Sequence, residues 1–264
     1  MALSPAVAGY DALLLDLDGC VYVGDKAVPG SVEAVEAWRE AGKGLAFLTN
    51  DARHSAEEYV RKLWRLGFRA SVHEVVTVGA ATQRLLAERG GGTAFVIGTE
   101  PFIEHVALAG MRVVNNTELA PRADVVVVAG HDDLHYAELR AATQAVLRGA
   151  ELVGATRDRT FPMPDGPWPA SGAVLAAVEA ATARTADLVV GKPEPPMYDT
   201  ALEGLSGRVL AVGDRIDIDV AGARRAGLDA ALVLSGTTSQ AEADAADPAI
   251  GLVAATLGTL VLGG

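Results

Sequence analysis

Short, mostly apolar runs alternate with helix-type patterns along almost the whole chain, and this alternation limits the fold more than any other feature. The runs lie at residues 12–15, 44–48, 94–97, 125–128, 188–190, 209–212 and 231–234. Residues 31–41 and 55–66, which follow the first two runs, have the apolar spacing of helices. Strands that alternate with helices form parallel sheets covered by helices. The sequence therefore predicts an α/β fold.

Composition limits the partners and the compartment. Half of the 264 residues are apolar, so a large core is available, and the formal charge of −12 argues against nucleic acid or an anionic membrane as a partner. No apolar stretch has membrane-spanning length, and the first residues lack the pattern of a secretion signal. The lone Cys20 cannot form an intramolecular disulfide. We expect a cytoplasmic protein.

Polar residues gather in four clusters, each directly after a predicted strand. They are Asp16 with Asp18, Thr49 with Asn50, Lys192 between Gly191 and Pro193, and Asp214 with Asp217 and Asp219. Ligands of open parallel sheets bind beyond the carboxyl ends of the strands. Residues 16 and 18 share strand parity, and two like charges held together require a cation, a shared proton or a reaction. The first cluster therefore predicts a metal-assisted acyl-phosphate or hydrolytic site.

The positions of these clusters also predict the domain organisation. They fall before residue 80 and after residue 187, with a separate α/β pattern between. We therefore expect a core formed by residues 1–79 and 187–264, with an inserted smaller domain at residues 80–186. Residues 20–28 alternate apolar and polar side chains around Gly24 and Asp25, which predicts a hairpin that covers the first carboxylates.

Taken together and in this order, the four clusters resemble the four motifs of the haloacid dehalogenase superfamily. Further segments are similar to its NagD-like or para-nitrophenyl-phosphatase-like branch, namely residues 55–59, 63–68, 158–162, 171–172 and 223–227. The resemblance extends from about residue 10 to residue 236. It implies a Rossmann-like parallel-sheet core with an α/β cap inserted between the second and third motifs.

The resemblance implies a catalytic role for the first and fourth clusters. Asp16 would attack phosphorus and form an aspartyl-phosphate, and Asp18 would act as general acid and then as general base. Because a carboxylate must approach a phosphate dianion, Mg²⁺ is expected between Asp16, Asp214 and the main-chain carbonyl of Asp18. The metal residues are thus predicted to be Asp16, Asp18 and Asp214.

The remaining motif residues would bind phosphate or support it. Lys192 would supply a second cation, and Thr49 with the backbone of Asn50 would orient the transferred group. Asp219 would orient Lys192 or a metal-bound water. Asp217 has a simpler interpretation, as a solvated acid in the first turn of a helix.

The inserted cap would determine substrate specificity, since core residues contact only the phosphate. Residues 157–170 are the predicted substrate loop, and the cap residues expected to bind substrate are Arg157, Asp158 and Ser171. The chain departs from the family pattern at Arg157 and Ser171, where Asn is often found. It also has Asp51 where a second Asn is usual and His54 where Arg is common. An added acid near the phosphate site disfavours highly anionic substrates.

The sequence thus predicts a Mg²⁺-dependent phosphatase of a small phosphorylated metabolite. Two alternatives stay open. A phosphotransferase or mutase of the same fold would pass the phosphoryl group from Asp16 to another acceptor, and a catalytically silent relative would only bind a phosphorylated ligand. Caps of this family can mediate dimer contacts, so a homodimer is also left open, as is a modulating role for Cys20 or Asp51.

Overall fold

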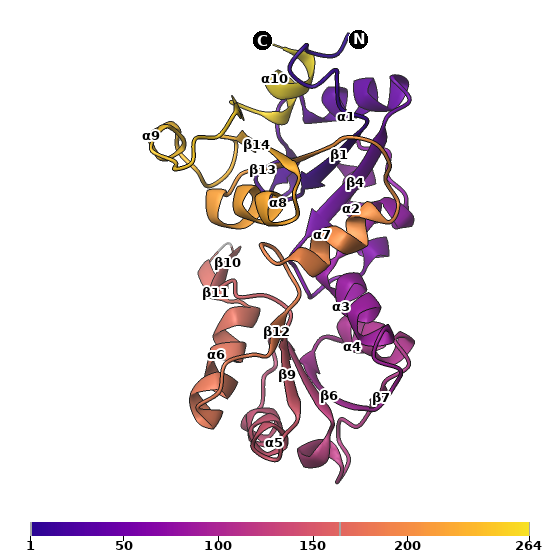
Figure 1. Cartoon of the computed structure of the whole chain (residues 1–264), viewed down its shortest axis with the longest axis vertical. Helices are drawn as coiled ribbons and strands as arrows, with labels where there is room; N and C mark the ends of the chain where they lie inside the picture. Colours follow the sequence, from indigo (N-terminus) through magenta and orange to yellow (C-terminus); the bar gives the residue numbers. More distant parts are fainter. Residues whose placement is uncertain (1, 164, 264) are drawn as a thin grey trace. The chain divides into compact units, whose positions relative to one another are not determined.

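The computed structural model describes residues 2–163 and 165–263, which form two compact units (Figure 1). The first unit contains the chain up to Thr49, Ala56–Val76, and the chain from Lys192 onward. The second contains Asn50–Ser55 and Thr77–Gly191. The short segment Asn50–Ser55 therefore belongs with the inserted unit, although the polypeptide on either side of it belongs to the first.

The first unit is built on a six-stranded sheet of order β15-β14-β13-β1-β4-β5. Its strands pair in parallel from β15 to β4. The strand bounds are β1 (Ala12–Asp16), β4 (Gly44–Thr49), β5 (Val75–Thr77), β13 (Val209–Gly213), β14 (Asp229–Val233) and β15 (Leu252–Ala254). The neighbours β13 and β1 thus come from opposite ends of the chain, and the carboxyl ends of the parallel strands lie at one edge of the sheet.

Helices of the first unit pack on this sheet. They are α1 (Ser31–Glu40), α2 (Ala56–Arg65), α7 (Pro195–Leu202), α8 (Ala221–Arg225), α9 (Gln240–Asp244) and α10 (Leu257–Leu262), with a 3₁₀ turn at Val72–Glu74 and a π-helical turn at Ile216–Val220. Trp38 of α1 and Leu63 of α2 join Leu13, Leu15 and Phe47 in one buried cluster. The alternate positions of β1 therefore face the core, and Asp16 leaves the opposite face.

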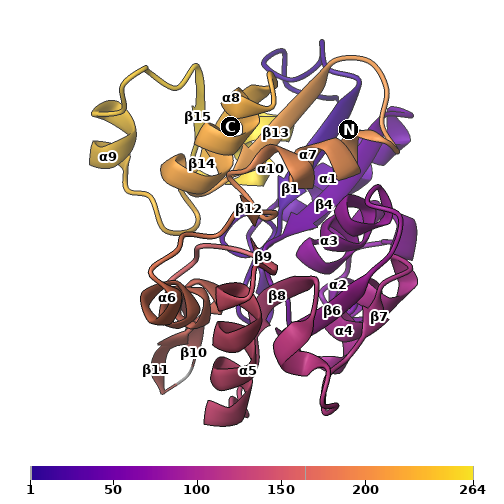
Figure 2. The same ribbon diagram turned by 60° about the horizontal axis from the view of Figure 1, so that its bottom comes forward.

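The inserted unit has a five-stranded sheet of its own, of order β12-β9-β8-β6-β7, with every pair parallel. Its strands are β6 (Thr93–Gly98), β7 (Arg112–Val113), β8 (Val125–Gly130), β9 (Glu151–Gly154) and β12 (Leu188–Val189). Its helices are α3 (Val78–Ala87), α4 (Glu100–Leu108), α5 (Tyr136–Leu147) and α6 (Ser171–Thr182), with a 3₁₀ turn at Ala120–Arg122. Figure 2 shows α5 and α6 beside β8 and β9, and their apolar residues share a buried cluster with these strands. The predicted α/β fold with an inserted smaller α/β unit is confirmed.

Two antiparallel hairpins interrupt the pattern of parallel strands. The hairpin predicted at residues 20–28 is present as β2 (Tyr22–Val23) and β3 (Lys26–Ala27). A second hairpin, β10 (Thr160–Met163) with β11 (Gly166–Pro169), lies within residues 157–170, where the sequence indicated only a loop. Proline disfavours strands because it lacks an N–H donor, but here Pro162 pairs with Pro167 in a two-stranded ribbon, whose outward N–H positions need no partner. Pro164, within the predicted loop, lies outside the described residues.

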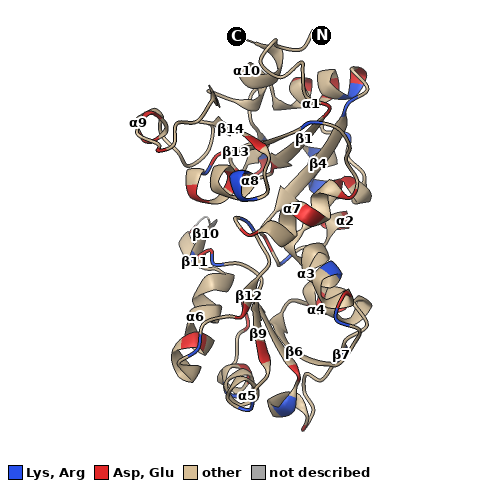
Figure 3. Ribbon diagram, in the orientation of Figure 1, with Lys and Arg blue, Asp and Glu red and all other residues tan. Residues whose placement is uncertain are grey.

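Both units carry charged residues of either sign. Basic and acidic positions are interspersed on the helices of each unit (Figure 3). Among helices of the described residues, none combines the length and the apolar character needed to cross a bilayer.

Candidate active site

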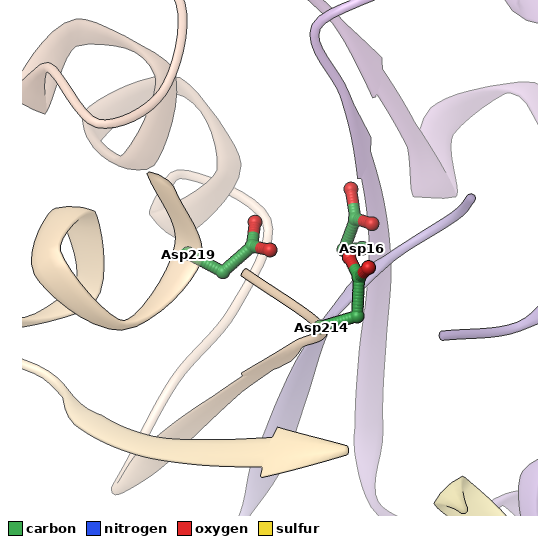
Figure 4. A group of neighbouring side chains, drawn as sticks. All are labelled: Asp16, Asp214 and Asp219. Carbon is green, nitrogen blue, oxygen red and sulfur yellow. The ribbon is translucent and has the colours of Figure 1, made fainter. Parts of the chain in front are cut away.

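The parallel register of the core sheet brings Asp16 and Asp214 together. Leu15 of β1 lies opposite Val212 of β13, so the residues that follow, Asp16 and Asp214, leave neighbouring strand ends. Asp219 comes from the π-helical turn directly after β13. Figure 4 shows the carboxylate of Asp219 turned toward those of Asp16 and Asp214. One carboxylate oxygen of each of the three lies within 4.8 Å of the others.

Lys192 is the cation of this cluster. Its ammonium donates hydrogen bonds to Asp16 and, over 2.7 Å, to Asp219 Oδ1, and its side chain is only 4% exposed. Asp219 Oδ2 in turn accepts a hydrogen bond from the backbone N–H of Arg215 at 3.1 Å. Lys192 therefore contacts two carboxylates, and an orienting role for Asp219 stays a prediction.

The pKa shifts of the cluster reflect burial and an excess of negative charge. Burial is the largest influence on Asp16 and raises its pKa well above the usual value, and the Asp219 and Asp214 carboxylates raise it further against the opposing effect of Lys192. Burial also raises the pKa of Asp214, although hydrogen bonding from Thr237 lowers it in part. For Lys192, the nearby carboxylates outweigh burial and raise the pKa well above its usual value. These shifts favour the protonated form of Lys192. They also show that a further cation would stabilise the ionised carboxylates.

These residues fit a divalent cation. When all three carboxylates are ionised beside one ammonium, two negative charges remain uncompensated in a largely buried place. In the absence of a further cation, this burial and excess of charge raise the pKa values of Asp16 and Asp214. Carboxylate oxygens are the ligands that Mg²⁺ prefers, and a divalent ion would neutralise that excess. The triad of Asp16, Asp214 and Asp219 could therefore hold a metal ion, and Mg²⁺ suits its chemistry.

Glycines make room for the carboxylates. A methyl group at Gly236 would lie 2.1 Å from Asp214 Oδ2, and one at Gly19 would lie 2.5 Å from the same atom. At Gly213, an added Cβ would lie 2.3 Å from Cγ of Asp219. Gly19 also has a φ of +84°, which other residues rarely adopt. The backbone around the site is therefore shaped for these side chains.

We expect Gly236→Ala to displace Asp214 and to lower metal affinity about tenfold, the size typical of a lost metal-supporting contact. The measurement is the Mg²⁺ concentration that gives half-maximal phosphate release. Gly251→Ala is the matched control, because nothing lies within 4 Å of a Cβ at that position. Equal Mg²⁺ requirements for the two variants would contradict the expectation.

The other core residues predicted from sequence lie at the same sheet edge. Thr49 is buried at the last position of β4, next to β1. Asp18 is exposed just beyond β1, in a bridge with Tyr22, and it is outside the group of closely spaced carboxylates. Asp217 is 72% exposed on its side chain and pairs with Arg215, as its interpretation as a solvated acid requires.

The three predicted cap residues all contact other parts of the inserted unit. Arg157 pairs with Glu179 of α6 at 2.9 Å, and the Ser171 hydroxyl donates to the Ala129 carbonyl. The Asp158 carboxylate accepts a hydrogen bond from the Asn50 side-chain amide at 2.8 Å. Substrate binding by these residues stays a prediction.

Sequence reasoning missed the segment after β14. The backbone N–H of Thr237 donates to Asp214 Oδ2 at 2.6 Å, and the Ser235 hydroxyl donates to the carbonyl of Gly19 at 2.7 Å. The signal was available, because Ser235, Gly236 and Thr237 follow the apolar run at 231–234. Small and polar residues at a strand end are the same kind of pattern that identified the other clusters.

Known proteins share both the sequence and the fold. A family model for haloacid dehalogenase-like hydrolases matches residues 13–112, and a second, HAD-hydrolase-like model matches residues 189–260. Human chronophin is 34% identical over 261 residues, covering 92% of this chain and 88% of chronophin. The D-glycerol 3-phosphate phosphatase of Mycobacterium tuberculosis is 36% identical over 242 residues, covering 90% of this chain and 67% of the relative.

Solved structures agree with these matches. The glycerol phosphate phosphatase of Mycobacterium tuberculosis, crystallised in complex with magnesium, has a TM-score of 0.90 at 33% identity and covers 98% of this chain and 79% of its own. The 4-nitrophenylphosphatase of Thermotoga maritima has a TM-score of 0.89 at 32% identity, with 97% of each chain covered. The family predicted from the motifs is thus confirmed: this chain belongs to the haloacid dehalogenase-like hydrolases, in the branch of NagD-like and para-nitrophenyl-phosphatase-like phosphoric monoester hydrolases.

Proposed function

We propose that the protein is a Mg²⁺-dependent phosphatase that hydrolyses a small phosphomonoester through a phosphorylated Asp16. The observation that carries this proposal is the buried cluster of Asp16, Asp214 and Asp219 around Lys192. A nucleophilic carboxylate can approach an anionic phosphate only where positive charge compensates both. Relatives that are named as glycerol phosphate and 4-nitrophenyl phosphatases support the same chemistry.

The reaction has two steps on the residues of the core. In the first, an oxygen of Asp16 attacks phosphorus while the bond to the leaving oxygen breaks, and Asp18 donates a proton to that oxygen. In the second, Asp18 takes a proton from water, the water oxygen attacks phosphorus, and inorganic phosphate leaves Asp16. Asp18 is suited to this exchange of protons because it is exposed to solvent.

The surrounding residues position the phosphoryl group and balance its charge. Thr49 and the backbone of Asn50, at the end of β4, would bind phosphoryl oxygens, and Lys192 would neutralise negative charge beside Asp16. Asp16, Asp214 and the main-chain carbonyl of Asp18 would hold Mg²⁺, with Asp219 close by. When bound there, Mg²⁺ supplies charge neutralisation for the phosphoryl transfer.

We also infer that residues 80–186 select the alcohol part of the substrate. The β10–β11 hairpin lies within residues 157–170, and residues 157–161 and 165–170 are exposed or partly exposed, as in segments that bind ligands. In this arrangement the hairpin segment would bind the alcohol part of the substrate, and the core residues would carry out the reaction of the phosphoryl group.

Phosphate release from a panel of phosphomonoesters tests the function. With Mg²⁺, we expect hydrolysis of para-nitrophenyl phosphate and of at least one polyol or sugar phosphate. Assays with added alcohol acceptors separate hydrolysis from transfer, since a phosphotransferase would form a new ester in place of inorganic phosphate. Failure to release phosphate from any ester would contradict the proposal.

A further inference from the structure

The segment Asn50–Ser55 contains an ion pair that the proposed mechanism does not use. Asp51 Oδ1 accepts a hydrogen bond from Arg53 Nε at 2.8 Å, and Asp51 Oδ2 accepts one from Arg53 Nη2 at 2.9 Å. Asp51 Oδ1 also accepts from the backbone N–H of Arg53 at 2.9 Å, and His54 Nδ1 lies 3.0 Å from Oδ2. Such a two-point contact is the strongest arrangement of a guanidinium and a carboxylate.

The guanidinium also contacts an aromatic ring. Arg53 Cζ lies 3.8 Å from the ring centroid of Phe161 in β10, and Phe161 packs near Trp168 of β11 with ring centroids 6.4 Å apart. The Asp51 side chain is 18% exposed and that of Arg53 is 28% exposed. Arg53 thus contacts both a carboxylate and an aromatic ring in a half-buried place.

The segment lies at the edge of the second sheet where ligands are expected. The chain leaves β6 toward β7 and leaves β8 toward β9, so the neighbouring strands β6 and β8 form a topological switch point. Thr99, just after β6, donates its hydroxyl to the carbonyls of Ala52 and Arg53 at 3.2 and 3.3 Å. The ion pair is therefore anchored beside the carboxyl ends of these strands.

Covalent connection also places Asp51 near the phosphate site. Thr49, the proposed phosphoryl-binding residue, precedes Asp51 by two residues, and two residues span at most about 7 Å. A second carboxylate, Asp158, contacts the neighbouring Asn50 side chain. The chain directly after Thr49 thus carries an arginine whose charge is balanced by Asp51, and Asn50 contacts a second carboxylate, Asp158.

We propose that the Asp51–Arg53 pair makes this enzyme select phosphomonoesters whose alcohol part is uncharged, such as polyol phosphates, against those with a second anionic group. This inference rests on the proposed phosphatase function and deepens it. A second anion on the substrate would have to compete with Asp51 for Arg53 and would approach a carboxylate as well. Uncharged hydroxyl groups meet neither obstacle.

The test compares two esters that differ at one group. Glycerol 3-phosphate has a hydroxymethyl group where 3-phosphoglycerate has a carboxylate, and the ratio of their kcat/KM values reports discrimination by charge. We expect the wild type to prefer glycerol 3-phosphate. In Asp51→Asn, which removes the carboxylate that contacts Arg53 in the wild type, the ratio should shift about tenfold toward 3-phosphoglycerate, the size expected for one charge contact in a half-buried site.

Arg53→Gln and the double variant complete a double-mutant cycle with Asp51→Asn. Arg53→Gln removes the positive charge beside the Asp51 carboxylate and should shift the ratio about tenfold the other way, whereas the double variant should return it near the wild-type value. Asp187→Asn is the matched control, because Asp187 forms a comparable pair with Arg184 in the same unit at 3.0 Å. A purely structural role for Asp51 would change both esters equally and leave the ratio unmoved.

The outcomes separate this inference from the function on which it rests. Phosphate release with a ratio that neither single variant changes would overturn the inference alone, as would a wild-type preference for 3-phosphoglycerate. If Asp51→Asn does not fold, as judged by circular dichroism, the Arg53→Gln ratio decides. No release by the wild type from these esters or from para-nitrophenyl phosphate would overturn the function and the inference together.

Discussion

Replacement of Asp16 by Asn is expected to reduce the turnover of para-nitrophenyl phosphate by at least about 10⁴-fold, the loss typical of a removed nucleophile. The amide cannot form the aspartyl-phosphate, and it also removes one of the charges that Lys192 neutralises. Single-turnover phosphate release is the measurement. The fold should remain, because Lys192 keeps its contact with Asp219 and the variant removes a carboxylate from an overly negative cluster.

Asp217→Asn is the control for that experiment. It makes the same chemical change four residues from the end of β13, at a side chain that is exposed and paired only locally with Arg215. Circular dichroism and thermal unfolding should give similar curves for both variants. If Asp16→Asn kept activity within about tenfold of the wild type, a loss far below that of a missing nucleophile, Asp16 could not be the group that is phosphorylated.

Removal of divalent metal should reduce phosphate release by at least about 100-fold, since charge stabilisation by a bound metal contributes several kcal/mol to such transition states. The physical reason is the excess of negative charge on Asp16, Asp214 and Asp219 over Lys192. Exhaustive chelation followed by stepwise addition of MgCl₂ measures the effect, and activity should return with the metal.

Thermal unfolding provides a second measurement of the same site. Because a ligand that binds only the folded state stabilises it, MgCl₂ should raise the Tm of the metal-free wild type. In Asp214→Asn the increase should be smaller, since one of the three closely spaced carboxylates is lost. Activity that survives chelation, together with a Tm that Mg²⁺ does not change, would exclude a metal centre at these residues.

Strand ends were the part of the site most accessible from sequence. An apolar run identifies a strand, and the residues after it must lie at the carboxyl edge of a parallel sheet. The order of residues along the chain is enough to identify Asp16, Thr49 and Asp214 in this way, and the observed order β13-β1-β4 places them on adjacent strands. The same reasoning applies to Ser235 and Thr237, whose strand is next to β13.

Local backbone geometry was harder to predict from the sequence than the positions of the strand ends. Strand parity suggested that Asp18 accompanies Asp16, yet β1 ends at Asp16 and Asp18 is exposed beyond it. Asp219, which joins the close group, lies in a π-helical turn after β13, and such turns are rare. The β10–β11 hairpin was hidden for a related reason, since its prolines oppose strand formation in general but fit a two-stranded ribbon.

By itself, the sequence determined the α/β class, the inserted second unit and the residues at the strand ends, because periodicity and chain order express these directly. Only the tertiary structure decided which charges meet. The contacts of Lys192 with Asp16 and of Arg53 with Phe161 join segments far apart in the chain. Contacts of that kind follow from packing, and the free energy of a buried charge depends on the partners that packing supplies.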